Sequence, residues 1–372
     1  MFMKNLFTIA FFLSISFYSF GQEKDMKLSD LKTPNSPGFQ LLDISPSSIE
    51  RPTNPKEFSL KFLNLFNNGN AIPKNFALEI SPFWYFKKKN ESVYKYLGVG
   101  EKTPETEKLG AQWSTGVLRK ANISLASTFS DSTAGSLLKN TNYVSFGFRT
   151  NLFTFRTSKQ NETINKALLD AAKRQDRIIN DALHNGNSLN EAEKKLDSDK
   201  SYNEAIKIAE KLPLLQFDAA FAYSDAFSDN SFNNRRFNRW ALWGSFAINA
   251  DFKSEKQDNH SLSFIFLAKA LRDNVLKDTS NKIFTEANSF DFGGKLEYSI
   301  NRLTLSIEYI NRNYNDMKSI NSERTVALIQ YKISDNLYAT GTYGKNFGNF
   351  NNVFSLLGLN WGFGNSKLST SK

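Results

Sequence analysis

The stretch GGKLEYSINRLTLSIEYINRN, residues 293–313, decides the fold, because its side chains alternate between apolar and polar. The alternation runs through residues 296–300, pauses at the pair 301–302, and resumes over residues 303–309. A period of two predicts a hairpin of two strands, each with one apolar face. A soluble sandwich would bury those faces against a second sheet, whereas a membrane barrel would turn them to lipid and keep the charged face inside.

The N-terminus has the features of an export signal. Lys4 is the only charge before the apolar run 6–17, and Ser19-Phe20-Gly21 offers a small-x-small cleavage site. We therefore expect a signal peptide over residues 1–21 and a mature chain that begins at Gln22 outside the cytoplasm.

Composition excludes several classes of protein. No later segment supplies the roughly 20 consecutive apolar residues of a membrane helix, and the absence of cysteine excludes disulfides, thiol chemistry and a lipid-modified cysteine. The net charge is +10, but the basic residues form no stripe, so nucleic acid is not an expected partner. Mean hydropathy is −0.45, yet the chain holds 34 Phe, 13 Tyr and 5 Trp, which favours aromatic girdles at a membrane interface.

Residues 22–73 differ in character from the rest of the chain. They are rich in Pro, Ser and Asn, and their prolines argue against a central strand. We expect an N-terminal strap or plug with one short helix around residues 57–66. It would fill a barrel, pack beneath it, or bind a partner.

Alternating segments recur from residue 74 to residue 364, and many of them approach the length that crosses a membrane when tilted. We count about eleven strands. Because both ends of such a barrel should lie on one side, we expect an antiparallel barrel of about twelve strands, with ten and fourteen as alternatives. The missing strand would lie near residues 94–99 or 112–117, and a polar tail, residues 365–372, would follow the barrel.

Residues 159–213 interrupt the barrel with a period of about 3.6, which predicts two or three amphipathic helices. The connections near residues 256–259, 301–302 and 334–336 are short and share one side by parity, and the insertion falls on that same side. Short turns are periplasmic in outer-membrane barrels. We therefore expect a periplasmic helical unit that covers its apolar stripe with its own helices, the strap or a periplasmic protein. The stripe consists of Ile164, Leu168, Ile178 and Leu183.

With its final strand VFSLLGLNWGFG and its Gly-Gln cleavage site, the chain resembles Gram-negative outer-membrane β-barrels, and its Asn/Lys/Phe-rich style is similar to exported barrels of Bacteroidetes-type bacteria. The resemblance covers residues 74–364 at the level of the class. It implies location in the cell outer membrane, contact with the lipid bilayer and lipopolysaccharide, and insertion by the barrel-assembly machinery. Such barrels usually end on an aromatic residue, whereas here residues 365–372 follow Gly364.

Catalysis finds little support. His260 precedes Ser261 and Ser263, whose hydroxyls fall on the other face of a strand, and His184 sits at a helix break. Two distant histidines cannot form a His-rich metal site, and no glycine loop for phosphate occurs. We expect no enzyme, no cofactor and no metal.

The inward face of the predicted barrel carries charges of both signs. They would line a polar conduit and set its selectivity, or pair with one another in a plugged barrel. The expected function is a porin-like conduit for small polar solutes. The alternatives are a non-conducting barrel that docks periplasmic partners through residues 22–73 and 160–212, and a secreted β-sandwich adhesin. The candidate lumen residues are Glu79, Arg149, Asp218, Arg239, Asp251, Lys295, Glu297 and Glu308.

Overall fold

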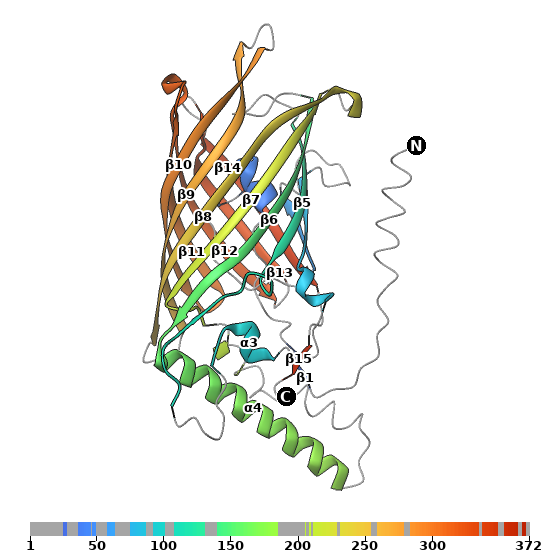
Figure 1. The fold of residues 1–372 in the computed structure, drawn as a ribbon, viewed down its shortest axis with the longest axis vertical. Helices are drawn as coiled ribbons and strands as arrows, with labels where there is room; N and C mark the ends of the chain where they lie inside the picture. Colours follow the sequence, from blue (N-terminus) through green and yellow to red (C-terminus); the bar gives the residue numbers. More distant parts are fainter. Residues whose placement is uncertain are drawn as a thin grey trace.

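The computed structural model is an antiparallel β-barrel (Figure 1). It describes residues 25–27, 36–45, 47–49, 58–63, 75–86, 92–100, 108–130, 140–184, 205, 208–209, 211–228, 231–253, 259–278, 283–334, 337–348, 353–363 and 367–369. The expected signal peptide lies outside these residues.

Twelve strands of the described part of the chain form the wall. They are β2 (Phe58–Leu63), β3 (Asn75–Ile80), β5 (Asn122–Ser130), β6 (Thr141–Arg156), β7 (Leu215–Ser228), β8 (Arg235–Lys253), β9 (Asn259–Asp278), β10 (Ile283–Ile300), β11 (Leu303–Tyr314), β12 (Ser322–Ser334), β13 (Leu337–Lys345) and β14 (Val353–Phe363). Each pairs antiparallel with its neighbours. The pairings β14–β2, β2–β3 and β6–β7 complete the ring, so the wall is closed.

The strand missing from the sequence prediction is β2. The prediction of a helix over residues 57–66 is therefore wrong. The sequence FSLKFL has period two, but its apolar residues also fit a helix. Because prolines lie nearby, the sequence analysis assigned it to the strap. Ser59 and Lys61 are buried on its inner face. The barrel therefore begins at Phe58, ahead of the expected boundary at residue 74. The two sites proposed for the missing strand hold the helix α3 (Val93–Leu97) and the short strand β4 (Gln112–Ser114), which pairs with the end of β6 outside the ring.

The opening hairpin lies where the sequence places it, and its apolar face points outward. Leu296 pairs with Ile307 and Tyr298 with Leu305, all four exposed, while Lys295 pairs with the buried Glu308. The turn uses Asn301, whose φ of 50° is a conformation that asparagine tolerates better than most residues. A sandwich would join such faces in a core, so the β-sandwich alternative is wrong.

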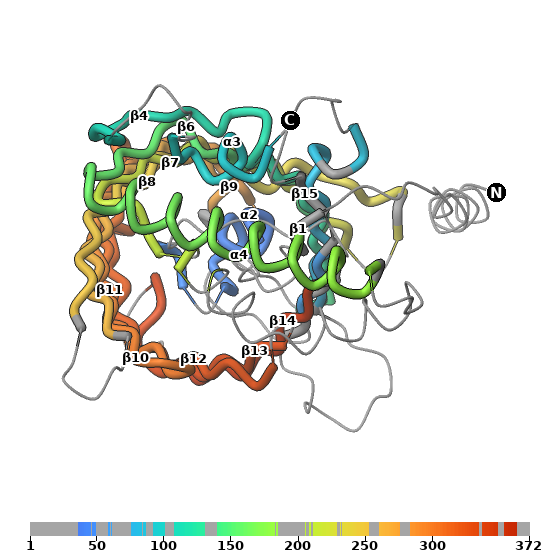
Figure 2. Tube along the Cα trace, turned by 90° about the horizontal axis from the view of Figure 1, so that it is seen from below, coloured from blue at the N-terminus to red at the C-terminus, as the bar shows by residue number. Residues whose placement is uncertain are grey.

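The predicted helical insertion is present and joins β6 to β7. Helix α4 (Ser158–His184) occupies most of its described part and crosses one end of the barrel (Figures 1 and 2). The short connections β8–β9, β10–β11 and β12–β13 reach the same end, as the parity argument requires. There also β1 (Asp25–Lys27) pairs with β15 (Lys367–Ser369), near α4 in Figure 1. No helix in the described ranges combines the length and the apolar character that crossing a membrane requires.

The first part of the α4 stripe packs in a cluster with α3, which the sequence analysis did not foresee, whereas Ile178 is half-buried outside that cluster. Ile164, Leu168 and Ala171 are buried in one cluster with Tyr96 and Leu97 of α3. Helix α3 begins with a Ser92 cap that accepts a bond from the Lys95 amide and ends at Gly98 in a left-handed conformation. Ala205 and Ala209 of the insertion join the cluster; the side chain of Leu183 lies outside the described set.

Candidate functional site

The interior of the barrel is occupied by the chain's own N-terminal segment. Residues 36–45 and 47–49, here called the plug, include the short helix α2 (Pro37–Leu41), which lies inside the ring of strands in Figure 2. Pro37 occupies the first turn, where its missing amide proton costs nothing. Every residue of α2 is buried, and α2 contacts β5, β6, β7 and β8.

Small inward residues make room for α2. The inner positions of β7 and β8 include Ala220, Ala222 and Ala241, which pack with Leu41 and Ile49 of the plug. On β6, a Cβ added at Gly147 would lie 2.7 Å from the Pro37 Cβ and 3.1 Å from the Gly38 amide nitrogen. Only glycine permits this approach of wall and plug.

Asp43, just after α2, is the centre of a buried ion network. Its Oδ2 accepts hydrogen bonds from Arg239 Nη1 at 2.6 Å and from Arg312 Nη1 at 2.8 Å, and its Oδ1 accepts from Arg312 Nη2 at 3.0 Å. Asn346 donates to the Asp43 carbonyl oxygen at 2.9 Å. Asp43 has a φ of 58°, so the plug backbone adopts a left-handed conformation to present this carboxylate.

Wall carboxylates hold the two arginines from behind. Asp273 accepts from Arg239 Nε at 3.2 Å and Nη2 at 3.0 Å, and Tyr314 donates to Asp273 at 3.0 Å. Asp291 accepts from Arg312 Nε and Nη2, both at 2.8 Å. The guanidinium carbon of Arg312 lies 3.8 Å from the centre of the Phe347 ring. Such charge-assisted, bidentate pairs fix the guanidinium planes.

Glu308 anchors the second part of the plug. It accepts from the Ser47 hydroxyl at 2.7 Å and from the Ile49 amide at 2.9 Å. Arg324 donates to Glu308 at 3.2 Å and to the Ser45 carbonyl oxygen at 2.8 Å. A carboxylate that accepts from backbone amides and a guanidinium is fully paired, which makes its burial tolerable.

The other candidate residues divide into separate groups. Lys295 donates to Ser47 at 3.2 Å and pairs with Glu297 at 3.2 Å, so both lie near the plug. Glu79 pairs with Lys61 at 3.0 Å on another part of the wall. Seven of the eight candidates are buried, and Asp251 is exposed near the end of β8.

Arg149 and Asp218 lie toward the end of the barrel that α4 crosses, here called the helical end. Asp218 accepts from Asn151 at 2.9 Å, and Arg156 donates to the Lys211 carbonyl oxygen at 2.8 Å. Burial and the nearby Arg156 lower the pKa of Lys120, in the turn before β5, to about 8. This end of the interior therefore carries an excess of positive charge.

Sequence reasoning missed most of the ion network around Asp43 and its neighbour Arg324. Arg312, Arg324, Asp273 and Asp291 stand at inward positions of strands that the alternation had identified, so extending the list of inward charges along each strand would have found them. Asp43 had no such signal, because it lies in a segment without periodicity.

The outer wall is apolar. Its exposed side chains include Leu242, Ile248, Phe264, Phe266, Phe290, Phe292, Leu296, Leu305, Ile307, Ile329 and Leu357. Aromatic residues flank them near the strand ends: Phe252, Tyr298, Tyr331 and Trp361 toward the helical end, and Tyr343 toward the other. Trp113 and Phe153 add a ring contact with centroids 5.5 Å apart at the helical end.

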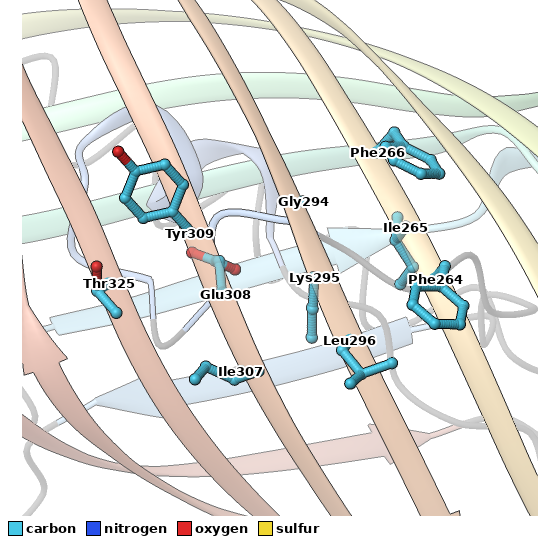
Figure 3. Close-up of a pocket in the computed structure, with 10 residues that line it drawn as sticks. All are labelled: Phe264, Ile265, Phe266, Gly294, Lys295, Leu296, Ile307, Glu308, Tyr309 and Thr325. Atoms are coloured by element: carbon cyan, nitrogen blue, oxygen red, sulfur yellow. The ribbon is translucent and has the colours of Figure 1, made fainter.

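A hollow of about 320 Å³ lies on this surface (Figure 3). It forms because Gly294 lacks a side chain between its register partners Phe266 and Tyr309. Its rim is apolar, while Lys295 and Glu308 occupy the alternate positions that belong to the interior network.

No protein-family model matches the chain, and no curated protein matches its sequence. Solved structures that are similar to it include the transport unit of the autotransporter AIDA-I from Escherichia coli, at 10% identity and a TM-score of 0.29, with 82% of this chain and 88% of that chain covered. The NanC porin is similar at 10% identity and a TM-score of 0.31, with 82% of this chain and 98% of that chain covered.

Proposed function

We propose that this chain is an outer-membrane β-barrel that forms a conduit for small polar solutes and that the plug keeps the conduit closed. The closed ring with an apolar outer face and aromatic strand ends supports membrane insertion. Signal peptide, bilayer, lipopolysaccharide and assembly machinery belong to the same proposal.

The observation that carries the proposal is how the plug is bound. A segment meant only to fill a barrel could pack with apolar side chains alone. Here the plug buries Phe39, Leu41, Leu42 and Ile49, and in addition it is held by ionic and polar contacts through Asp43, Ser47 and the backbone around Ser48. Charged and polar groups released by the plug would be solvated by water, whereas apolar side chains would collapse together, so the interior that the plug vacates would be filled with water.

Planar-bilayer recording tests the proposal. The variant Asp43→Asn with Glu308→Gln removes the negative charge at both plug anchors while keeping side-chain size. We expect the wild type to be closed most of the time and the double variant to show a clearly higher open probability. Glu79→Gln is the matched control, because it removes a buried carboxylate from a pair with Lys61 and no contact between Glu79 and the plug is recorded.

Silence of the wild type, the double variant and a chain without residues 36–49 would contradict the conduit. It would favour the alternative, a non-conducting barrel that docks periplasmic partners. In that alternative, the unit formed by α3 and α4 at the helical end would provide the surface that binds the partner.

A further inference from the structure

The pair Arg239 and Arg312 forms a receptor for a carboxylate. Three N–H groups of the two guanidiniums converge on the Asp43 carboxylate at 2.6 to 3.0 Å. Both arginines are almost fully buried, with 0% and 2% of their surface exposed. In so dry a place these contacts are much stronger than in water.

Both receptor arginines belong to the wall, and wall side chains also hold their guanidiniums. Asp273 and Asp291 accept from Nε and Nη2 of the two arginines, Tyr314 donates to Asp273, and Phe347 lies against the Arg312 plane. Among the described residues, the Nη1 groups of both arginines contact no carboxylate other than Asp43, and Arg239 Nη1 also donates to the Leu41 carbonyl oxygen of the plug at 2.9 Å. Removing Asp43 would therefore leave ordered donors that face the interior.

The charge balance of the interior favours an anion at this position. The buried charged side chains of the described residues comprise nine cations, Lys61, Lys120, Arg149, Arg156, Arg239, Lys269, Lys295, Arg312 and Arg324, and seven anions, Asp43, Glu79, Asp218, Asp273, Asp291, Glu297 and Glu308. Asp43 belongs to the plug. Part of the positive excess lies at the helical end, but around Asp43 itself Arg239, Arg312 and Lys269 would face only Asp273 and Asp291 among the described carboxylates once Asp43 leaves, so a mobile anion is the natural replacement.

We propose that the Arg239–Arg312 pair is a binding site for the carboxylate of a solute and that Asp43 occupies it as an internal substitute while the barrel is closed. The passage of that solute rests on the proposed conduit, whereas binding at the arginines does not. The plug and the solute then compete for the same two arginines, and the barrel is closed while Asp43 occupies them.

Chemical rescue tests the site in the full-length protein. Asp43→Gly removes the carboxylate, tolerates the positive φ, and leaves room for a small anion. The temperature at which the folded gel mobility is lost is measured in acetate and in chloride at equal ionic strength. We expect acetate to raise this temperature by several degrees in Asp43→Gly, since a ligand of the folded state stabilises it.

Wild type and Asp43→Asn are the controls, because their side chains fill the site. In each of these proteins, the temperature at which the folded gel mobility is lost should be the same in acetate as in chloride. Adding Arg312→Gln to Asp43→Gly should abolish the acetate effect. An acetate effect no larger than that of chloride in Asp43→Gly, or an equal acetate effect in Asp43→Asn, would overturn the proposal.

Solute flux separates this site from the conduit and decides the case if Asp43→Gly does not fold. In liposomes holding the Asp43→Asn, Glu308→Gln variant, we expect glucuronate to enter roughly tenfold faster than glucose. Adding Arg312→Gln should remove that preference and leave glucose entry. Glucose entry without a preference for glucuronate overturns the carboxylate site and leaves the conduit standing. No entry of either solute overturns the conduit, and the acetate measurement still decides the site.

Discussion

At the scale of single residues, the interior shows how a β-barrel wall packs around a segment that is not part of the wall. Some inward positions carry charged residues that bind the plug, and others carry small residues that admit it. On β8, Arg239 is followed at the next inward position by Ala241, so an ion pair and a position for close packing lie side by side there. Sequence alternation identifies these positions as inward, but not which charges meet, because partners such as Asp43 and Arg239 lie far apart in the chain.

Gly147 tests the close approach of plug and wall. Gly147→Ala would bring a Cβ within 2.7 Å of Pro37, and crowding of this kind costs about 1–3 kcal/mol. We expect the plug to shift, with a higher open probability in bilayers and a lower temperature of unfolding. Gly110→Ala is the matched control, since its added Cβ meets nothing within 4 Å. Equal open probability and equal temperature of unfolding in the two variants would mean that the plug does not depend on close packing against Gly147.

At the scale of elements, the sequence predicts best where periodicity is long. The hairpin of β10 and β11 follows from its alternation, and α4 follows from its 3.6 period and ends at His184, where the helical pattern breaks. Strand β2 was missed because six residues fit both periods. Helix α3, with five residues, is too short to show a period at all, and its role depends on packing against α4.

Two adjacent leucines test the packing of α4. Leu168 is fully buried against the α3 cluster, whereas Leu169 is 39% exposed. We expect Leu168→Ala to destabilise the helical unit by about 2–5 kcal/mol and Leu169→Ala to have little effect. Protease cleavage within α4 measures the loss, and the gel mobility of the folded barrel should stay unchanged. Equal protease sensitivity of both variants would show that α4 does not depend on this cluster.

The side of the membrane on which α4 lies can be read with single cysteines, because the chain has none of its own. Asp181 is exposed near the end of α4, and Ser319 is exposed in the connection between β11 and β12 at the opposite end of the barrel. We expect a membrane-impermeant maleimide to label Ser319→Cys on intact cells, and to label Asp181→Cys only after the outer membrane is permeabilised. The reverse pattern would invert the proposed orientation.

At the scale of the whole molecule, the strand number follows from a constraint rather than from counting. Sequence periodicity finds about eleven strands, and the requirement that both ends of the barrel meet on one side raises the number to an even one. The structure confirms twelve among its described residues. The sequence predicts a strap or plug in the N-terminal segment but cannot tell which of the two forms, because what fills a barrel depends on contacts between remote parts of the chain.

The apolar outer wall makes a prediction that separates a membrane barrel from a soluble one. Ile307 is 55% exposed in the middle of β11, and Asn313 is exposed near its end on the same face. In water, arginine at either position would be tolerated, since neither side chain is buried. In a bilayer, arginine near the midplane costs about 2–4 kcal/mol and near the interface about 0–1 kcal/mol. We therefore expect Ile307→Arg to lower the fraction that folds into liposomes, measured by heat-modifiable gel mobility, and Asn313→Arg to match the wild type. Equal folding of all three proteins, with or without lipid, would contradict the membrane assignment, because it would mean that water surrounds this wall.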